Sequence, residues 1–269
     1  MTGSASKQAL RRGVAALRVP YGFERSCKII DGRVFNDRYL LSVHRAALGS
    51  DPLGQIGSLF APVGMPDALA AELSSNWSGT DVVHFGYEAA GDVEICKVYF
   101  EHVDALRRAQ AQGSDRPVLV HRAWKWPLPA AQRCLVTDYT WRKAERGQNL
   151  MTRIAQFCEP AGDSHPGLHA VRKVREAVGD AVAFDDLMLL EVEEGTERRS
   201  FDLNLYPAKL TLSQIEPALD RLCDDFAVPR AEFDAAFAPV LGLKLGHLSG
   251  GYGRDGRPFV TVYFGVESC

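Results

Sequence analysis

The sequence predicts an α+β fold in which a closed antiparallel β-barrel of repeated α-β-β-α units carries its helices on the outside. Three observations predict it: hairpins alternate with helical segments along the chain, the hairpin strands are apolar on one face only, and four of them end in the same motif. With 269 residues, 46% of them hydrophobic, the chain can bury an ample core. No low-complexity segment or linker interrupts the pattern, so we expect a single domain over residues 1–269.

Hairpins are predicted where period-two alternation flanks a short polar turn. The turn at Ala90, Gly91 and Asp92 is the clearest of these signals. The expected strand pairs are Cys27–Phe35 with Arg38–Arg45, Val82–Ala89 with Val93–Glu101, Pro117–Trp126 with Arg133–Trp141, Leu187–Glu193 with Arg199–Leu205, and Leu243–Gly250 with Pro258–Val266. The expected helices are Met1–Arg18, Met65–Ser74, Val103–Gln112, Asn149–Cys158, Leu168–Val178, Leu212–Phe226 and Arg230–Ala238.

The second strand of four hairpins ends in a polar or charged residue with a tyrosine two positions later. These endings are Lys97-Val98-Tyr99, Thr137-Asp138-Tyr139, Asn204-Leu205-Tyr206 and Thr261-Val262-Tyr263. Side chains alternate between the faces of a strand, so the first residue and the tyrosine share one face. An open sheet with solvent-facing tyrosines would explain one such strand. Four copies in successive repeats favour the inner face of a closed barrel that is wide enough to hold a ligand.

Composition excludes several classes of protein. The net charge of -3 argues against a nucleic-acid binder, which usually has a basic surface. No apolar stretch approaches the roughly 20 residues needed to span a bilayer, and the N-terminal segment lacks the apolar region of a secretory signal. The six cysteines show no CxxC spacing, so we expect free thiols rather than disulfides or a zinc cluster. We expect a cytoplasmic monomer.

In this organisation and in its strand endings the chain resembles the aromatic prenyltransferases of the ABBA fold. Lys97-Val98-Tyr99 is similar to the family's Lys-x-Tyr pair, and Asn204-Leu205-Tyr206 to the Asn-x-Tyr strand of its bacterial phenol-prenylating branch. The resemblance implies that an allylic isoprenoid group passes from its diphosphate to an aromatic acceptor inside the barrel. The acceptor stays open between indole, phenol, phenazine and a peptide side chain.

This chemistry needs cations and hydroxyl donors around the departing diphosphate and aromatic faces around the allylic cation. Arg133, Arg198 and Arg257 lie near strand starts, and counting in twos places them on the faces of the tyrosines. The residues that the resemblance implies for diphosphate binding and for shielding the cation are Lys97, Tyr99, Arg133, Tyr139, Arg198, Asn204, Tyr206, Arg257 and Tyr263.

Two carboxylates depart from the family's pattern or lack a secure counterpart in it. The family's fungal indole branch carries Arg-x-Lys-x-Tyr where this chain has Asp202-Leu203-Asn204-Leu205-Tyr206. The carboxylate of Asp202 would repel diphosphate unless a metal ion bridges them, which allows Mg2+ as a cofactor near Asp202. Glu88, in the strand beside Lys97, is the candidate general base for the acceptor; an exposed carboxylate at a sheet edge is the alternative.

Other interpretations stay open from the sequence. A non-catalytic barrel that binds an apolar or aromatic small molecule would explain the tyrosines, although it gives Lys97 little to do. The anionic partner of Lys97 is either diphosphate or a barrel carboxylate such as Glu88 or Asp202. Aromatic pairs in the partner strands could line the acceptor pocket or pack in the core; they are Trp124 with Trp126 and Phe85 with Tyr87.

Overall fold

The computed structural model describes residues 4–128, 134–145 and 148–269, and it confirms the closed antiparallel barrel with helices around it. Ten of the described strands form the ring, in which each strand pairs antiparallel with its neighbours and β11 pairs with β1. The ring consists of β1 (Gly22–Ile30), β3 (Arg38–His44), β4 (Val82–Ala90), β5 (Val93–Glu101), β6 (Val118–Leu128), β7 (Leu135–Trp141), β8 (Leu189–Glu193), β9 (Arg199–Asn204), β10 (Leu245–Tyr252) and β11 (Pro258–Ser268). A short strand, β2 (Arg33–Phe35), pairs only with the end of β1.

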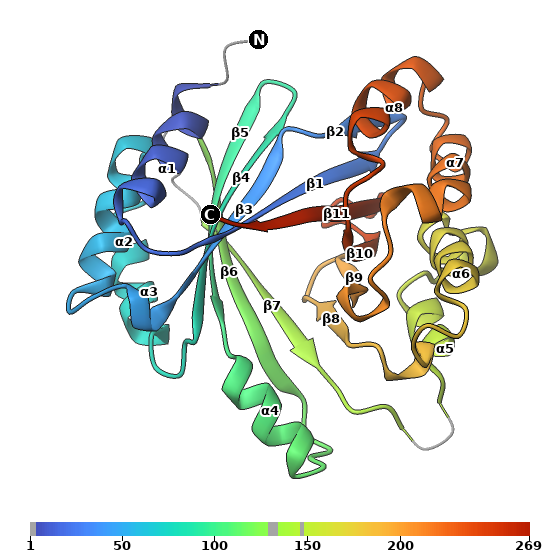
Figure 1. Ribbon diagram of the computed structural model, residues 1–269. Coiled ribbons are helices and arrows are strands. Elements are labelled where there is room, and N and C mark those ends of the chain that lie inside the picture. The colour runs from blue at the N-terminus through green and yellow to red at the C-terminus, as the bar shows by residue number, and fades with distance from the viewer. Residues whose placement is uncertain (1–3, 129–133, 146–147) are drawn as a thin grey trace.

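The helices lie outside the barrel in two groups (Figure 1). The first three flank one side of the ring and the last four flank the opposite side, while α4 lies between the groups at the lower end of the view. None of the described helices is long and apolar enough to cross a membrane. The helices are α1 (Ala5–Ala16), α2 (Pro52–Phe60), α3 (Leu69–Asn76), α4 (Val103–Ala111), α5 (Leu150–Gln156), α6 (Pro166–Val178), α7 (Glu216–Asp225) and α8 (Arg230–Phe237).

The predicted strand Cys27–Phe35 is divided by a tight turn at Asp31 and Gly32, both with positive φ, into the end of β1 and the separate strand β2.

Helix α2 was not predicted from the sequence. It contains Gly54 and Gly57, which lower helix propensity. The carboxylate of Asp51 caps the helix by accepting a hydrogen bond of 3.0 Å from the backbone nitrogen of Gly54. Burial of Ile56 and Phe60 against the barrel then stabilises a segment whose local sequence is a poor helix former.

The apolar core lies between the outer face of the barrel and the helices. Val98, Leu205 and Val262, the middle residues of three strand endings, have no exposed surface and pack there. The aromatic side chains of the partner strands pack in this layer too, so core packing was the right one of the two interpretations for them. These side chains are Phe85, Tyr87, Trp124 and Trp126.

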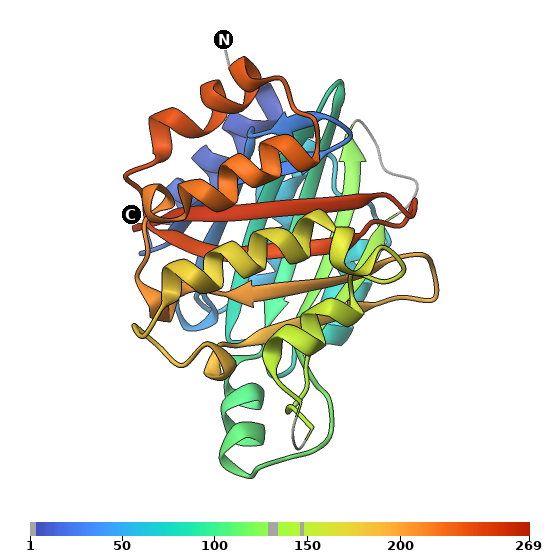
Figure 2. The ribbon, with the colours of Figure 1, turned by 90° about the vertical axis from the view of Figure 1, so that its right-hand side faces the viewer.

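The ring is paired unevenly around its circumference. Strands β4 and β5 pair over nine register positions, whereas β7 and β8 pair over two, Thr140 with Glu191 and Trp141 with Leu190, among the residues described. In Figure 2 the β8–β9 and β10–β11 turns lie at one end of the barrel and the C-terminus at the other. The barrel therefore has a turn end, where the hairpins reverse, and a connection end, where the chain leaves for the helices.

We expect Phe60→Ala to destabilise the fold by about 3–5 kcal/mol, the usual range for emptying a buried aromatic site. Phe60 is fully buried, and its ring centroid lies 5.7 Å from that of Phe85 and 4.9 Å from that of Trp126. Urea unfolding of the variant and the parent measures the change. Val93→Ala, at a side chain that is 47% exposed, serves as the control and should stay within about 0.5 kcal/mol. A loss for Phe60→Ala no larger than that of the control would contradict tight packing of α2.

Candidate functional site

The interior of the barrel holds two cavities, of about 310 and 500 Å³, at opposite ends. Tyr99, Tyr139 and Tyr263 line both of them, so these three tyrosines stand where the cavities meet. We call the cavity at the turn end the basic compartment and the one at the connection end the histidine compartment. The sequence predicted one shared cavity for four tyrosines; the fourth, Tyr206, lines only the histidine compartment.

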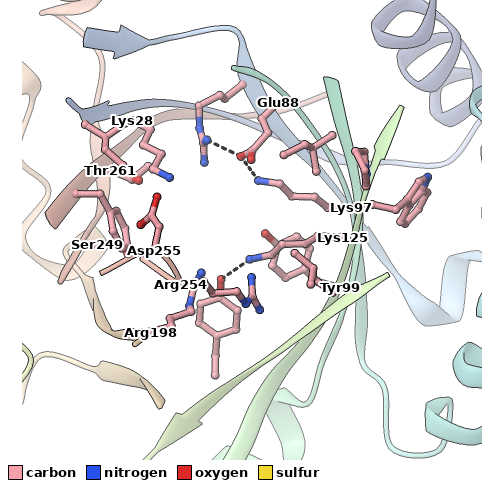
Figure 3. Close-up of a pocket in the computed structure, with 18 of the residues that line it drawn as sticks. Lys28, Glu88, Lys97, Tyr99, Lys125, Arg198, Ser249, Arg254, Asp255 and Thr261 are labelled. Atoms are coloured by element: carbon pink, nitrogen blue, oxygen red, sulfur yellow. Dashed lines mark hydrogen bonds and ion pairs between the residues drawn. The ribbon is translucent and has the colours of Figure 1, made fainter. Parts of the chain in front are cut away.

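Cations dominate the basic compartment. Figure 3 shows Lys97 and Lys125 extending from one wall towards Lys28 and Arg198 on the other. The cationic residues lining it are Lys28, Arg38, Lys97, Lys125, Arg198 and Arg254, and the carboxylates are Glu88 and Asp255. Among the described lining residues the positive groups thus outnumber the negative ones, and an anion that enters meets several donors.

Glu88 holds two of these cations. Its Oε2 atom is in ion pairs with Nζ of Lys97 and with a guanidinium nitrogen of Arg38. Burial lowers the pKa of Lys97 to about 7, and Glu88 partly offsets this. Although burial opposes it, Arg38 and Lys97 hold the pKa of Glu88 well below its usual range. The anionic partner of Lys97 in this structure is therefore Glu88, and a carboxylate with so low a pKa is a weak base for an acceptor.

Lys125 was missed by the sequence analysis, although it lies directly opposite Lys97 in the β5–β6 pairing. Its Nζ donates a hydrogen bond of 3.3 Å to the hydroxyl of Tyr139 and lies 5.8 and 5.6 Å from the ring centroids of Tyr99 and Tyr139. Burial and the neighbouring arginines, Arg198 first, hold the pKa of Lys125 well below its usual range. The sequence contained an indication of this position. Lys125 stands between Trp124 and Trp126, and if the tryptophans face outward, alternation places Lys125 on the inner face.

The predicted arginines have different positions. Arg198 lines the basic compartment, with Nε 3.7 Å from Glu194, whereas Arg133 lies outside the described residues. Arg257 does not point inward: it is in ion pairs with Asp31 and Asp255, and its side chain is 55% exposed. These two carboxylates hold the guanidinium outside the barrel, although the alternation counted from Tyr263 predicted the inner face for Arg257.

Arg254, a second unpredicted cation, comes from the β10–β11 turn. It donates two hydrogen bonds of 2.7 Å to the carboxylate of Glu194 and one of 3.0 Å to the hydroxyl of Thr137. The turn is thereby anchored to β7 and to the β8–β9 turn at the mouth of the basic compartment.

The histidine compartment is walled by titratable and apolar side chains together. Its carboxylates are Glu24, Glu101 and Asp202, and its histidines are His84, His121 and His247. Asn204, a predicted site residue, also lines it, and its Oδ1 accepts a hydrogen bond of 3.1 Å from the backbone nitrogen of Tyr206. The remaining lining residues are Leu40, Ser42, Met188, Leu190, Tyr206 and Val266, with the three shared tyrosines.

Each shared tyrosine has a histidine directly opposite it on the neighbouring strand. The pairs are His84 with Tyr99, His121 with Tyr139 and His247 with Tyr263. Their ring centroids lie 6.1, 6.0 and 6.0 Å apart with interplanar angles of 85°, 87° and 73°. The sequence analysis found the tyrosine motif only in the second strand of each hairpin and did not relate it to the histidines on the first strands.

Asp202 lies on the histidine side of the tyrosines, not among the cations where diphosphate was expected to meet it. Its Oδ1 is 2.6 Å from Nδ1 of His247. Although burial opposes it, Asp202, together with Glu24 and Glu101, raises the pKa of His247 to about 9, which favours the imidazolium form of this histidine. Asp202 does not fit the predicted Mg2+ site, because its carboxylate is paired with His247 and it lines only the histidine compartment, whereas the cations line the basic compartment.

Tyr206 and Glu24 form a second engaged pair in the histidine compartment. Tyr206 follows the end of β9 in a short helical turn, and its hydroxyl donates a hydrogen bond to Oε1 of Glu24. Burial raises the pKa of Glu24, and the nearby Asp202 adds to the effect. Glu24 is therefore a stronger proton acceptor than Glu88.

No family model and no curated protein matches the chain by sequence. Its structure is similar to that of AnaPT from Neosartorya fischeri, with 13% identity and a TM-score of 0.50 over 90% of this chain and 77% of that one. It is similar also to 5-dimethylallyltryptophan synthase from Streptomyces coelicolor, with 16% identity and a TM-score of 0.57 over 90% and 80%. Similarity at this identity establishes the fold, and the chain therefore has the ABBA barrel fold expected from its resemblance to the aromatic prenyltransferases.

Proposed function

We propose that the protein is an aromatic prenyltransferase, which transfers an allylic isoprenoid group from its diphosphate to an aromatic acceptor. The observation that carries the proposal is the division of one barrel interior into a cationic and a mixed compartment that meet at three tyrosines. An allylic diphosphate has an anionic head, which the basic compartment matches, and an allylic group, which the three tyrosines would surround. The likeness to 5-dimethylallyltryptophan synthase supports the same reaction class.

The diphosphate would bind in the basic compartment beside Lys97 and Arg38, which keep their ion pairs with Glu88, and would accept hydrogen bonds from the cations that line the cavity. The bond between the allylic carbon and the diphosphate oxygen breaks, and its electron pair leaves with the diphosphate. Cations that are already positioned stabilise the developing negative charge without reorganisation. Glu88 and Asp255, the carboxylates of this compartment, are both paired with cations, which supports binding of the diphosphate by side chains rather than by Mg2+.

The allylic cation would form between Tyr99, Tyr139 and Tyr263. Aromatic faces attract a cation, and burial keeps out the water that would otherwise capture it. Burial also raises the pKa of Tyr99 and Tyr263 well above the usual range, so both side chains stay neutral hydroxyl donors.

The acceptor would lie in the histidine compartment and attack the cation with its ring electrons. The proton on the attacked carbon must then leave, and the carboxylate of Glu24 is our candidate to take it, in place of Glu88. Its raised pKa makes it the better match to a proton transfer near neutral pH.

Pure protein incubated with dimethylallyl or geranyl diphosphate and a panel of indoles, phenols and other aromatics should yield prenylated products, detected by mass, with or without Mg2+.

Glu24→Gln should bind the diphosphate like the parent but transfer the prenyl group at least about 100-fold more slowly, the usual contribution of a general base. Full activity in Glu24→Gln with loss in Glu88→Gln would return this role to Glu88. Saturable ligand binding without any product would instead support the non-catalytic barrel.

Lys97→Met should weaken binding of geranyl diphosphate by roughly 2–5 kcal/mol, the range for removing one partner of a buried charge pair. Calorimetric titration of both proteins measures the loss, and melting curves report whether the fold is retained. Lys173→Met is a matched control, because Lys173 lies on α6 and pairs only with Glu176 at the surface among the residues described. Parent-like affinity in Lys97→Met, together with a lowered melting temperature, would mean that Lys97 serves only its pair with Glu88.

Diphosphate binding should take up protons above neutral pH. Lys97 has a pKa of about 7 in the free protein, and a bound anion raises it. Between the free and the bound pKa the complex holds more protons than the free protein, so affinity falls as pH rises through this window. Calorimetry at pH 8.5 in buffers of different ionisation enthalpy measures the uptake. The uptake should shrink in Lys97→Met; an unchanged value would assign the proton to another group.

A further inference from the structure

The histidine compartment contains a cluster of metal-ligating side chains that the proposed transfer does not use. His84, Glu101 and His121 project from the inner faces of the adjacent strands β4, β5 and β6. Glu101 lies directly opposite His121, and His84 is two positions from the residue opposite Glu101. The register thus gathers one ligand atom from each side chain, all within 4.8 Å of one another.

The spacing of these atoms fits a single ion. The two carboxylate oxygens of Glu101 lie 3.0 Å from Nε2 of His84 and 4.0 Å from Nε2 of His121. Ligands about 2.1 Å from a tetrahedral zinc ion are about 3.4 Å from one another. The two distances to Glu101 lie on either side of this value, and all three ligand atoms are within 4.8 Å of one another, so rotation of the side chains can adjust them towards one ion.

The surroundings of the two histidines favour a ligand role over a simple ion pair. Nδ1 of His84 is 2.8 Å from the hydroxyl of Ser42, which orients the ring with Nε2 towards Glu101, as outer partners of metal-bound histidines do. His121 makes no side-chain hydrogen bond in the part of the chain that the structure describes; an ion would bind Nε2, while the buried Nδ1 would stay without a partner. The 4.0 Å between His121 and Glu101 is too long for a hydrogen bond, so the protein alone does not satisfy this ring.

We propose that His84, Glu101 and His121 bind a divalent transition-metal ion of the zinc or cobalt type inside the barrel. Two imidazoles suit such ions, whereas Mg2+ prefers oxygen ligands alone. Three protein ligands leave a coordination position open, and it faces a cavity of about 500 Å³. An oxygen donor on a small molecule in that cavity, such as a hydroxyl or carboxylate, can fill it. This site differs from the Mg2+ expected at Asp202 and does not depend on the proposed transfer.

The experiment is a metal titration of chelator-treated full-length protein that carries Cys269→Ser, which removes the exposed thiol. Calorimetry with Zn2+ should show saturable binding of one equivalent, and Co2+ should give the visible bands of a low-coordinate site. Glu101→Gln and His121→Asn should weaken binding more than about 100-fold, and Ser42→Ala, which removes only the outer partner, about 10-fold. His169→Asn is the control, because His169 pairs with Asp225 outside the barrel, and it should keep the parent's affinity.

Two results would overturn the site: no saturable Zn2+ binding by the parent, or parent-like affinity in Glu101→Gln. Binding of Mg2+ as tight as that of Zn2+ would overturn the class of ion. Melting curves identify a variant that fails to fold. In that case Ser42→Ala tests the site: a Zn2+ affinity about 10-fold below that of the parent supports it, and an unchanged affinity contradicts it. No prenyl substrate enters the titration, so its outcome is separate from that of the transfer assay.

Discussion

The pairing of β11 with β1 is the constraint on which the interior depends, because it turns a sheet into a ring. It runs over seven register positions from Gly22 with Ser268 to Ile29 with Val260. In a ring the inner faces of all strands look at one another, so polar and aromatic residues at alternate positions share one enclosed space. In an open sheet the same residues would be solvated, and neither compartment would exist.

Enclosure creates an electrostatic problem that the barrel resolves in two ways. Buried charges are costly unless they are paired or lose their charge. Glu88 pairs with Arg38 and Lys97, while burial and neighbouring cations favour the neutral amine of Lys125. The basic compartment is thus folded without a ligand yet keeps the donors that an anion needs.

Alternation along single strands was enough to predict the barrel and the inward position of Lys97, because period two is a local property. Contacts across strands depend on register, which one strand does not reveal. Lys125 and His84 were missed for this reason: what marks each as a site residue is that it lies opposite Lys97 or Tyr99 on the neighbouring strand. Arg257 was misplaced because its ion pairs with Asp31 and Asp255 hold it outside the barrel, and α2 was missed because packing, not propensity, forms it. Asp202 and His247 lie on the adjacent strands β9 and β10, so their pairing likewise depends on register.

The sparse pairing of β7 with β8 makes the ring mechanically uneven. Two register pairs hold this seam, among the residues described, while nine hold β4 to β5. Opening a barrel costs least where the fewest backbone hydrogen bonds must break, so fluctuations of the ring concentrate there. Tyr139 on β7 and Leu190 on β8 both face cavities beside the seam. Separation of β7 from β8 would therefore enlarge the interior for a ligand with a long hydrocarbon chain, while the two ends of the barrel stay unchanged.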